Sequence, residues 1–125
     1  MSLGTFVNDC VALRQDEAAA GGETRYHDSF RRFLLRTVSN QHMVRGEGSY
    51  DQRRPDFRIY TLQDGETRDS PPNEEGLLGF VEAKGHSENL INLMRNDPRN
   101  QLSSYLDICD NVLITNYWEY RLIQR

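Results

Sequence analysis

Apolar residues recur every three or four positions in the first third of the chain and every second position in several later segments. The first spacing is typical of a helix with one buried face, and the second of a strand whose side chains alternate between two sides. We predict helices over residues 5–20, 23–38, 87–94 and 99–107, with Ser87 capping the third and Pro98 opening the fourth. We predict strands over residues 42–45, 56–61, 77–84, 112–115 and 117–123, with a solvated connection at 64–75.

This order of elements predicts an α/β fold, in which helices flank a central mixed sheet of four or five strands. A chain of 125 residues has the size of one ordinary domain, so we expect a single domain over residues 1–125. The sequence has no apolar run near the roughly 20 residues that span a bilayer, and its first residues lack the features of a secretory signal. We therefore expect a cytoplasmic protein without a membrane segment, in which Cys10 and Cys109 are buried thiols.

The formal net charge is −4, which argues against a nucleic-acid-binding surface that covers the whole molecule. The distribution of the basic residues is more informative than the total. Fourteen of the fifteen are arginine, and the single lysine is Lys84. Lysine is a compact charge that can sit beside a reacting oxygen. A unique lysine at the end of a predicted strand therefore favours a chemical role for that residue.

Glu82 and Lys84 close a predicted strand and are separated by one residue, so both side chains project from the same face. Antiparallel pairing with the preceding strand would bring Asp56 to the same end of the sheet. Two carboxylates and the backbone carbonyl of Ala83 are oxygen ligands of the kind that Mg²⁺ prefers. Lys84 beside them would help to form hydroxide or stabilise charge at a phosphorus atom. A plain salt bridge between Glu82 and Lys84 is the alternative.

Three motifs in this part of the chain resemble the PD-(D/E)xK nuclease superfamily. They are Pro55-Asp56, Glu82-Ala83-Lys84 and, on the following predicted helix, Gln101-x-x-x-Tyr105. The strands around them are similar to the N-terminal nuclease domain of single-chain restriction-modification enzymes, which also carry an adenine methyltransferase. The resemblance covers about residues 23–122 and implies a restriction-endonuclease-like fold.

The resemblance implies a metal-dependent DNA endonuclease that hydrolyses phosphodiester bonds, with Mg²⁺ as the ion and Mn²⁺ as its substitute. Asp56, Glu82 and the backbone carbonyl of Ala83 would hold the metal, and Lys84 would assist the attacking water. Alanine stands at position 83 where a bulkier aliphatic residue is common in the family. A ligand supplied by the backbone tolerates that difference.

The resemblance also implies supporting residues and partners. Gln101 and Tyr105 would orient the site or contact the DNA backbone. Many members add an acid from the first helices, for which Glu23 is the best match and Asp28 and Glu17 are alternatives. The expected partners are double-stranded DNA, a second copy in a transient dimer, and methyltransferase and target-recognition domains in a longer chain. This domain would then be the nuclease fragment of that chain.

Other interpretations of the same residues stay open. The acid and lysine at the strand end can be a solvated pair, the aspartate after Pro55 can begin a turn, and the helix tyrosine can belong to the core. The arginines near the predicted site, Arg53, Arg54 and Arg58, can steer phosphate or be solvated, and His86 can be an exposed loop histidine. The alternative functions are a recombination or repair nuclease, and a catalytically inactive nuclease-like module that binds DNA or a protein.

Overall fold

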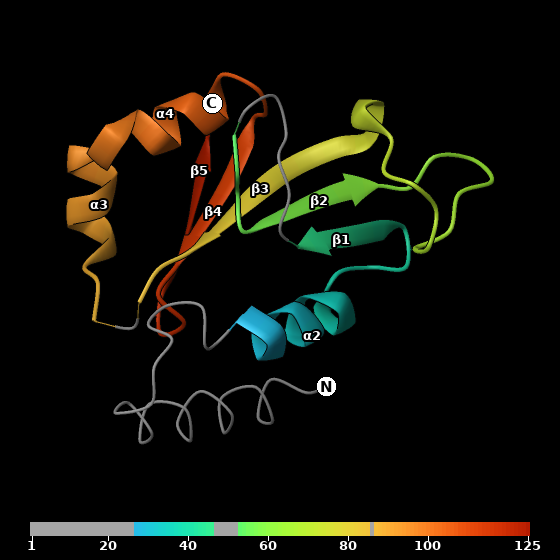
Figure 1. Ribbon diagram of the computed structural model, residues 1–125, viewed down its shortest axis with the longest axis horizontal. Helices are drawn as coiled ribbons and strands as arrows, with labels where there is room; N and C mark the ends of the chain where they lie inside the picture. The colour runs from blue at the N-terminus through green and yellow to red at the C-terminus, as the bar shows by residue number, and fades with distance from the viewer. Residues whose placement is uncertain (1–26, 47–52, 86) are drawn as a thin grey trace.

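The computed structural model describes residues 27–46, 53–85 and 87–125, which form a five-stranded sheet with helices on both faces (Figure 1). The helices are α2 (His27–Thr37), α3 (Leu90–Asn96) and α4 (Gln101–Leu106), and the 3₁₀ turns are η2 (Glu74–Gly76) and η3 (Pro98–Asn100). The strands are β1 (His42–Gly46), β2 (Phe57–Thr61), β3 (Leu77–Ala83), β4 (Asn111–Thr115) and β5 (Tyr120–Gln124). The predicted α/β class with a mixed sheet is confirmed.

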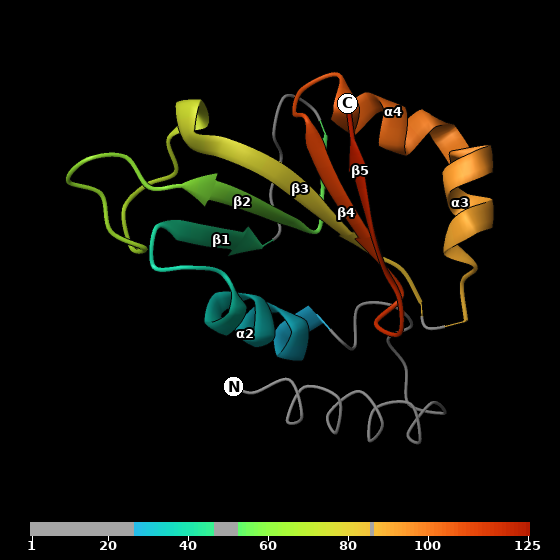
Figure 2. The same ribbon diagram turned by 180° about the vertical axis from the view of Figure 1, so that it is seen from behind.

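The strands lie in the order β1-β2-β3-β4-β5, and β3 and β4 form the parallel pair among antiparallel neighbours. Parallel strands need a long crossover connection, and here the crossover contains α3 and α4. Figure 2 shows these two helices at the β4–β5 end of the sheet, with β1 at the opposite end. The antiparallel pairing of β2 with β3 is the arrangement that the sequence predicted.

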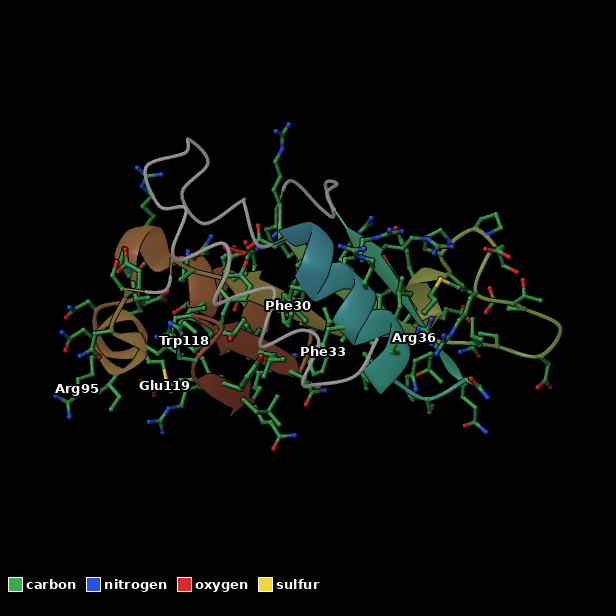
Figure 3. All side chains as sticks on the ribbon, turned by 90° about the horizontal axis from the view of Figure 1, so that it is seen from below. Phe30, Phe33, Arg36, Arg95, Trp118 and Glu119 are labelled. Carbon is green, nitrogen blue, oxygen red and sulfur yellow. The ribbon has the colours of Figure 1, made fainter. Side chains whose placement is uncertain are left out.

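Side chains alternate between the two faces of the sheet, and each face has its own core. On the face covered by α2, Val81 and Ala83 of β3 pack with Phe57 of β2 and with Phe30 and Leu34 of the helix. In Figure 3, viewed from the side of α2, the helix crosses in front of the sheet with Phe30 at their boundary. We call this the α2 face.

The opposite side of the sheet, the α4 face, is covered by the crossover helices. Phe80 of β3 packs there with Ile114 of β4 and with Leu102 and Tyr105 of α4. The Phe80 and Tyr105 rings meet edge to face with their centroids 5.2 Å apart. Glu82 follows Phe80 by two residues in β3, so its carboxylate is on this face, under α4.

The helices of the crossover begin later than predicted. The cap of α3 is Asn89 rather than Ser87, and its side chain accepts a backbone N–H from the first turn. Pro98 opens η3 rather than α4, and Arg99 has the left-handed φ of 60°, which is incompatible with a continuous helix. α4 therefore begins at Gln101. Neither the cap at Asn89 nor the break at Arg99 is marked by a distinctive pattern of apolar residues in the sequence.

The strands β1 to β4 lie within one residue of their predicted limits, but β5 begins at Tyr120 rather than at residue 117. The Oδ1 of buried Asn116 accepts the backbone N–H groups of Trp118 and Glu119, at 3.0 and 2.8 Å. Tyr117 has φ 75°. These residues form the turn between β4 and β5. The alternating residues of the sequence predicted a strand at this position instead of a turn.

Several expectations concern residues outside the described part of the chain. They are the helix over residues 5–20, the beginning of the helix over 23–38, and Cys10. Within the described part, Cys109 is buried as predicted, and its thiol is free. No helix among the described residues has the length and apolar character to cross a membrane.

Gly79 allows β3 to approach β4 at the start of their parallel pairing. A Cβ atom added there would lie 2.5 Å from the backbone oxygen of Asn111, closer than carbon and oxygen pack. We expect Gly79→Ala to lower the free energy of unfolding by about 1–3 kcal/mol, as overpacked sites do. Urea denaturation measures this change.

The matched control is Gly46→Ala, whose Cβ would meet the Phe57 ring at an ordinary 3.6 Å. This variant should unfold at nearly the wild-type urea concentration. Equal losses of stability in the two variants would contradict the role given to Gly79.

Candidate functional site

The pairing of β2 with β3 brings Asp56 and Glu82 to one end of the sheet. Asp56 immediately precedes β2, and its Oδ2 accepts the backbone N–H of Ala83 at 2.8 Å. The β2–β3 register continued by two residues would place Pro55 opposite Ala83. Proline has no N–H to donate to the Ala83 carbonyl. Where the ladder ends, the Asp56 carboxylate thus accepts the Ala83 N–H, and Pro55 provides no N–H for the Ala83 carbonyl.

Glu82 is 4% exposed, and three side chains donate to its carboxylate. The Tyr105 hydroxyl donates to Oε1 at 3.2 Å. Gln101 Nε2 and Lys84 Nζ donate to Oε2, at 3.1 and 3.4 Å. A carboxylate has about four lone-pair positions, so three donors leave room for one more partner. Burial of the charge is tolerable because of this set of donors.

Gln101 holds the lysine and the carboxylate with opposite ends of one amide. Its Oε1 accepts from Lys84 Nζ at 2.9 Å, and its Nε2 donates to Glu82 and to the Tyr105 hydroxyl at 3.2 Å. Gln101 and Tyr105 are four residues apart on α4, so they share one face of that helix. The spacing recognised in the sequence therefore aims two polar groups at a single acid.

The electrostatic environment raises the pKa of Glu82 to about 7. Burial is the largest cause, and the nearby Asp56 charge adds to it, while Lys84 and the hydrogen bonds act in the opposite direction. The pKa of the Tyr105 hydroxyl is also raised, by burial and then by Glu82. Tyr105 consequently remains protonated and serves as a donor.

Asp97 fixes the start of α4, which carries the two donors. Its carboxylate accepts the backbone N–H groups of Leu102 and Ser103 at 2.6 and 3.0 Å, and the Ser103 hydroxyl at 2.5 Å. The chain reaches this cap through left-handed residues, with φ 40° at Asp97, 60° at Arg99 and 55° at Asn100. Such backbone conformations are costly for residues other than glycine and are concentrated at functional sites.

Arg53 joins α4 to the segment that leads into Asp56. Its Nε donates to the backbone oxygen and to the hydroxyl of Ser104, at 2.9 and 2.7 Å. Arg53 and Ser104 are far apart in the sequence, so no local pattern could reveal their contact. The position of Arg53 ties together the two segments that carry the site.

The segment after Lys84 is held by the end of β4. The Lys84 N–H donates to the Thr115 oxygen at 2.7 Å, and the buried Asn116 side chain donates to the backbone oxygen of Glu88 at 2.8 Å. Sequence patterns gave no role to Asn116. A buried asparagine after an apolar strand is the signal that could have indicated one, because buried amides need partners.

A cleft of about 510 Å³ lies between α3, α4 and the end of β3. Lys84, Gln101 and Tyr105 line it, together with Glu88, Arg99 and Ser104 from the surrounding segments. The Lys84 side chain is 19% exposed, compared with 5% for that of Glu82. The lysine is thus the member of this pair that a molecule in the cleft would reach first.

The structure brings together Asp56, Glu82, Ala83, Lys84, Gln101 and Tyr105, the six residues predicted for the site. It does not place the additional acid: Glu23 and Glu17 lie outside the described residues, as does His86. Asp28 lies in α2, which covers the opposite face of the sheet. The described residues contain no group of three or more His, Cys, Asp or Glu side chains suited to a metal ion.

Comparison of the chain with protein-family models, curated proteins and solved structures gave no match. A functional assignment therefore depends on the motifs and on the geometry of the site.

The raised pKa of Glu82 predicts how stability depends on pH in the absence of metal. Between the ordinary value of 4.5 and about 7, the folded state holds a proton that the unfolded state releases. The contribution of Glu82 to the free energy of unfolding is therefore fully present below about pH 4.5 and is lost as the pH rises through about 7. We expect this contribution to be on the order of 3 kcal/mol and to disappear in Glu82→Gln.

Urea midpoints measured with a chelator between pH 4 and pH 8 test this expectation. Glu74→Gln is the control, because Glu74 is exposed in the short turn η2. The control should retain the wild-type dependence. A wild-type dependence in Glu82→Gln as well would assign the effect to other groups.

Proposed function

We propose that this chain is a metal-dependent deoxyribonuclease with a PD-(D/E)xK-type site. The observation that supports it most is the convergence on Glu82 of Lys84, Gln101 and Tyr105, with Asp56 beside them. Residues from three separate motifs contribute to one constellation. If Glu82 and Lys84 were only a solvated pair at a strand end, the acid would not need two donors from α4, since water would supply them.

The residues present fit a hard divalent cation. Asp56 and Glu82 offer carboxylate oxygens and Ala83 a backbone carbonyl, which are the ligand types that Mg²⁺ or Mn²⁺ would take from this chain. The two acids are close enough for Asp56 to raise the pKa of Glu82. A cation would offset that repulsion and favour both ionised forms. When bound, such an ion would lower the pKa of a coordinated water and stabilise charge on the phosphoryl group.

The chain's own residues divide the remaining tasks. Lys84 borders the cleft and carries a positive charge that would stabilise the oxygen charge developing during phosphodiester hydrolysis. Gln101 fixes the direction of the lysine by accepting from Nζ at 2.9 Å. Tyr105 donates to Glu82 and leaves the acid anchored but still able to take another partner.

Beyond the reaction, the proposal includes a restriction-endonuclease-like fold and a place as the cleavage module of a restriction-modification enzyme. Double-stranded DNA would be the substrate, and methyltransferase and target-recognition domains would belong to the same longer, cytoplasmic chain. Two copies would meet transiently to cut both strands. The same site would serve equally in a recombination or repair nuclease.

A module that binds DNA or a protein without cutting is the second candidate. The observation that favours it is the hydrogen-bond network around Glu82, in which Lys84 donates to both Glu82 and Gln101. A purely structural network would have the same form. Catalysis and metal binding separate the two candidates.

We expect Lys84→Ala and Asp56→Asn each to reduce Mg²⁺-dependent nicking of supercoiled DNA by about 100-fold or more, because each removes a charge from the reacting centre. Asparagine retains an oxygen that can accept the Ala83 N–H, so Asp56→Asn should keep the end of the strand intact. Agarose-gel assays measure the rate.

Arg121→Gln is the control, since Arg121 is exposed on β5 and pairs with the exposed Glu119. It should cut at the wild-type rate. Cleavage that neither Lys84→Ala nor Asp56→Asn reduces would refute the catalytic assignment.

Metal binding gives an independent test. Titration calorimetry with Mg²⁺ or Mn²⁺ should show binding that Glu82→Gln abolishes and the remote control Glu74→Gln retains, because only the former removes a carboxylate ligand. Binding retained in Glu82→Gln would contradict the proposed metal site. Binding that depends on Glu82 in a protein that cuts no DNA would favour the non-cleaving module.

A further inference from the structure

Arg45 of β1 and Arg58 of β2 lie directly opposite each other in the sheet. Opposed residues project from the same face. Arg58 is also opposite Phe80, which packs under α4, so both arginines lie on the α4 face. Asp56 precedes Arg58 by two residues, which is about 7 Å along an extended strand. The arginine pair (Arg45 and Arg58) is thus next to the candidate site on the same surface.

Neither arginine forms an ion pair with an acid in the described part of the chain. Arg45 donates to the backbone oxygen of Ser70 at 2.6 Å. Arg58 donates to the Tyr60 hydroxyl at 3.3 Å, and its guanidinium carbon lies 5.9 Å from the centre of the Tyr60 ring. Its Nε is buried and has no hydrogen-bond partner among the described residues.

This arrangement is unfavourable for the folded protein by itself. Like charges directly opposite each other across two strands repel, and a buried N–H without a partner loses its hydration without compensation. An anion bound at this surface would offset the repulsion between the two arginines.

We propose that the arginine pair binds a phosphodiester group of the nucleic acid backbone, within a few nucleotides of the one positioned for hydrolysis. The inference rests on the proposed function, because it takes the substrate to be a polynucleotide. The guanidinium fork matches two phosphate oxygens at once. A local pair of this kind also reconciles nucleic acid binding with the net charge of −4, since attraction is confined to one face.

The test is binding of a fluorescent DNA duplex, measured by anisotropy at several salt concentrations with a chelator present, so that no cleavage occurs. Arg45→Gln and Arg58→Gln should each weaken binding and reduce the slope of log K against log salt by about 1, the effect of losing one phosphate contact. Both variants should melt at or above the wild-type temperature, because the repulsion is relieved. A purely structural role would predict the opposite shift in melting.

Arg95→Gln is the matched control, since Arg95 is an exposed arginine in the last turn of α3. It should leave the salt slope unchanged. The inference would be overturned if neither pair variant changes the salt slope, or if Arg95→Gln reduces the slope as much as they do. If a glutamine variant fails to fold, Arg58→Lys decides: it should keep the slope but weaken binding, and unchanged affinity would overturn the inference.

Failure of the proposed function would leave a different pattern. If Lys84→Ala and Asp56→Asn do not alter cleavage but the pair variants still lose slope, the nuclease assignment fails and the anion site stands. If those two variants abolish cleavage while the pair variants bind as the wild type does, the nuclease stands and the arginine pair has no part in binding.

Discussion

Glu82 places a carboxylate on a buried face of the central strand, and a buried charge destabilises a fold unless donors surround it. Most of the architecture around the site supplies or positions those donors. α4 contributes Gln101 and Tyr105, the Asp97 cap sets where α4 begins, and Arg53 ties α4 to the segment before β2. The helix packs on an apolar core and at the same time turns Gln101 and Tyr105 toward the acid beneath it.

The two faces of the sheet show how differently the same strands are used. The α2 face is closed by aliphatic and aromatic contacts, with the Phe30 ring perpendicular to those of Phe57 and Tyr117. The α4 face begins with a similar core around Phe80 and becomes polar toward the end of β3. Because alternation along a strand separates the faces so cleanly, the polar side can carry chemistry without weakening the apolar side.

Much of this could be predicted from the sequence, and the exceptions have physical reasons. Alternation located β2, and short apolar runs located β3 and β4, which are buried on both faces of the sheet. The motif spacing found both ends of the Gln101–Tyr105 pair. The beginning of α4 could not be predicted, because left-handed Arg99 is imposed by the connection rather than by its own preference. The contact of Arg53 with Ser104 joins distant segments and leaves no periodic signal.

The crossover between β3 and β4 also determines when the hydrogen bonds around Glu82 are completed. Glu82 lies before the crossover and Gln101 within it, so their hydrogen bond requires the connection to fold back across the sheet and β4 to align in parallel. Pairings of this kind carry a loop-closure cost and form slowly. The β2–β3 pairing alone brings Asp56 to Glu82 and Lys84, whereas Gln101 and Tyr105 reach the acid only when the crossover has folded back. Glu82 thus acquires the donors that make its burial tolerable only when the crossover is in place.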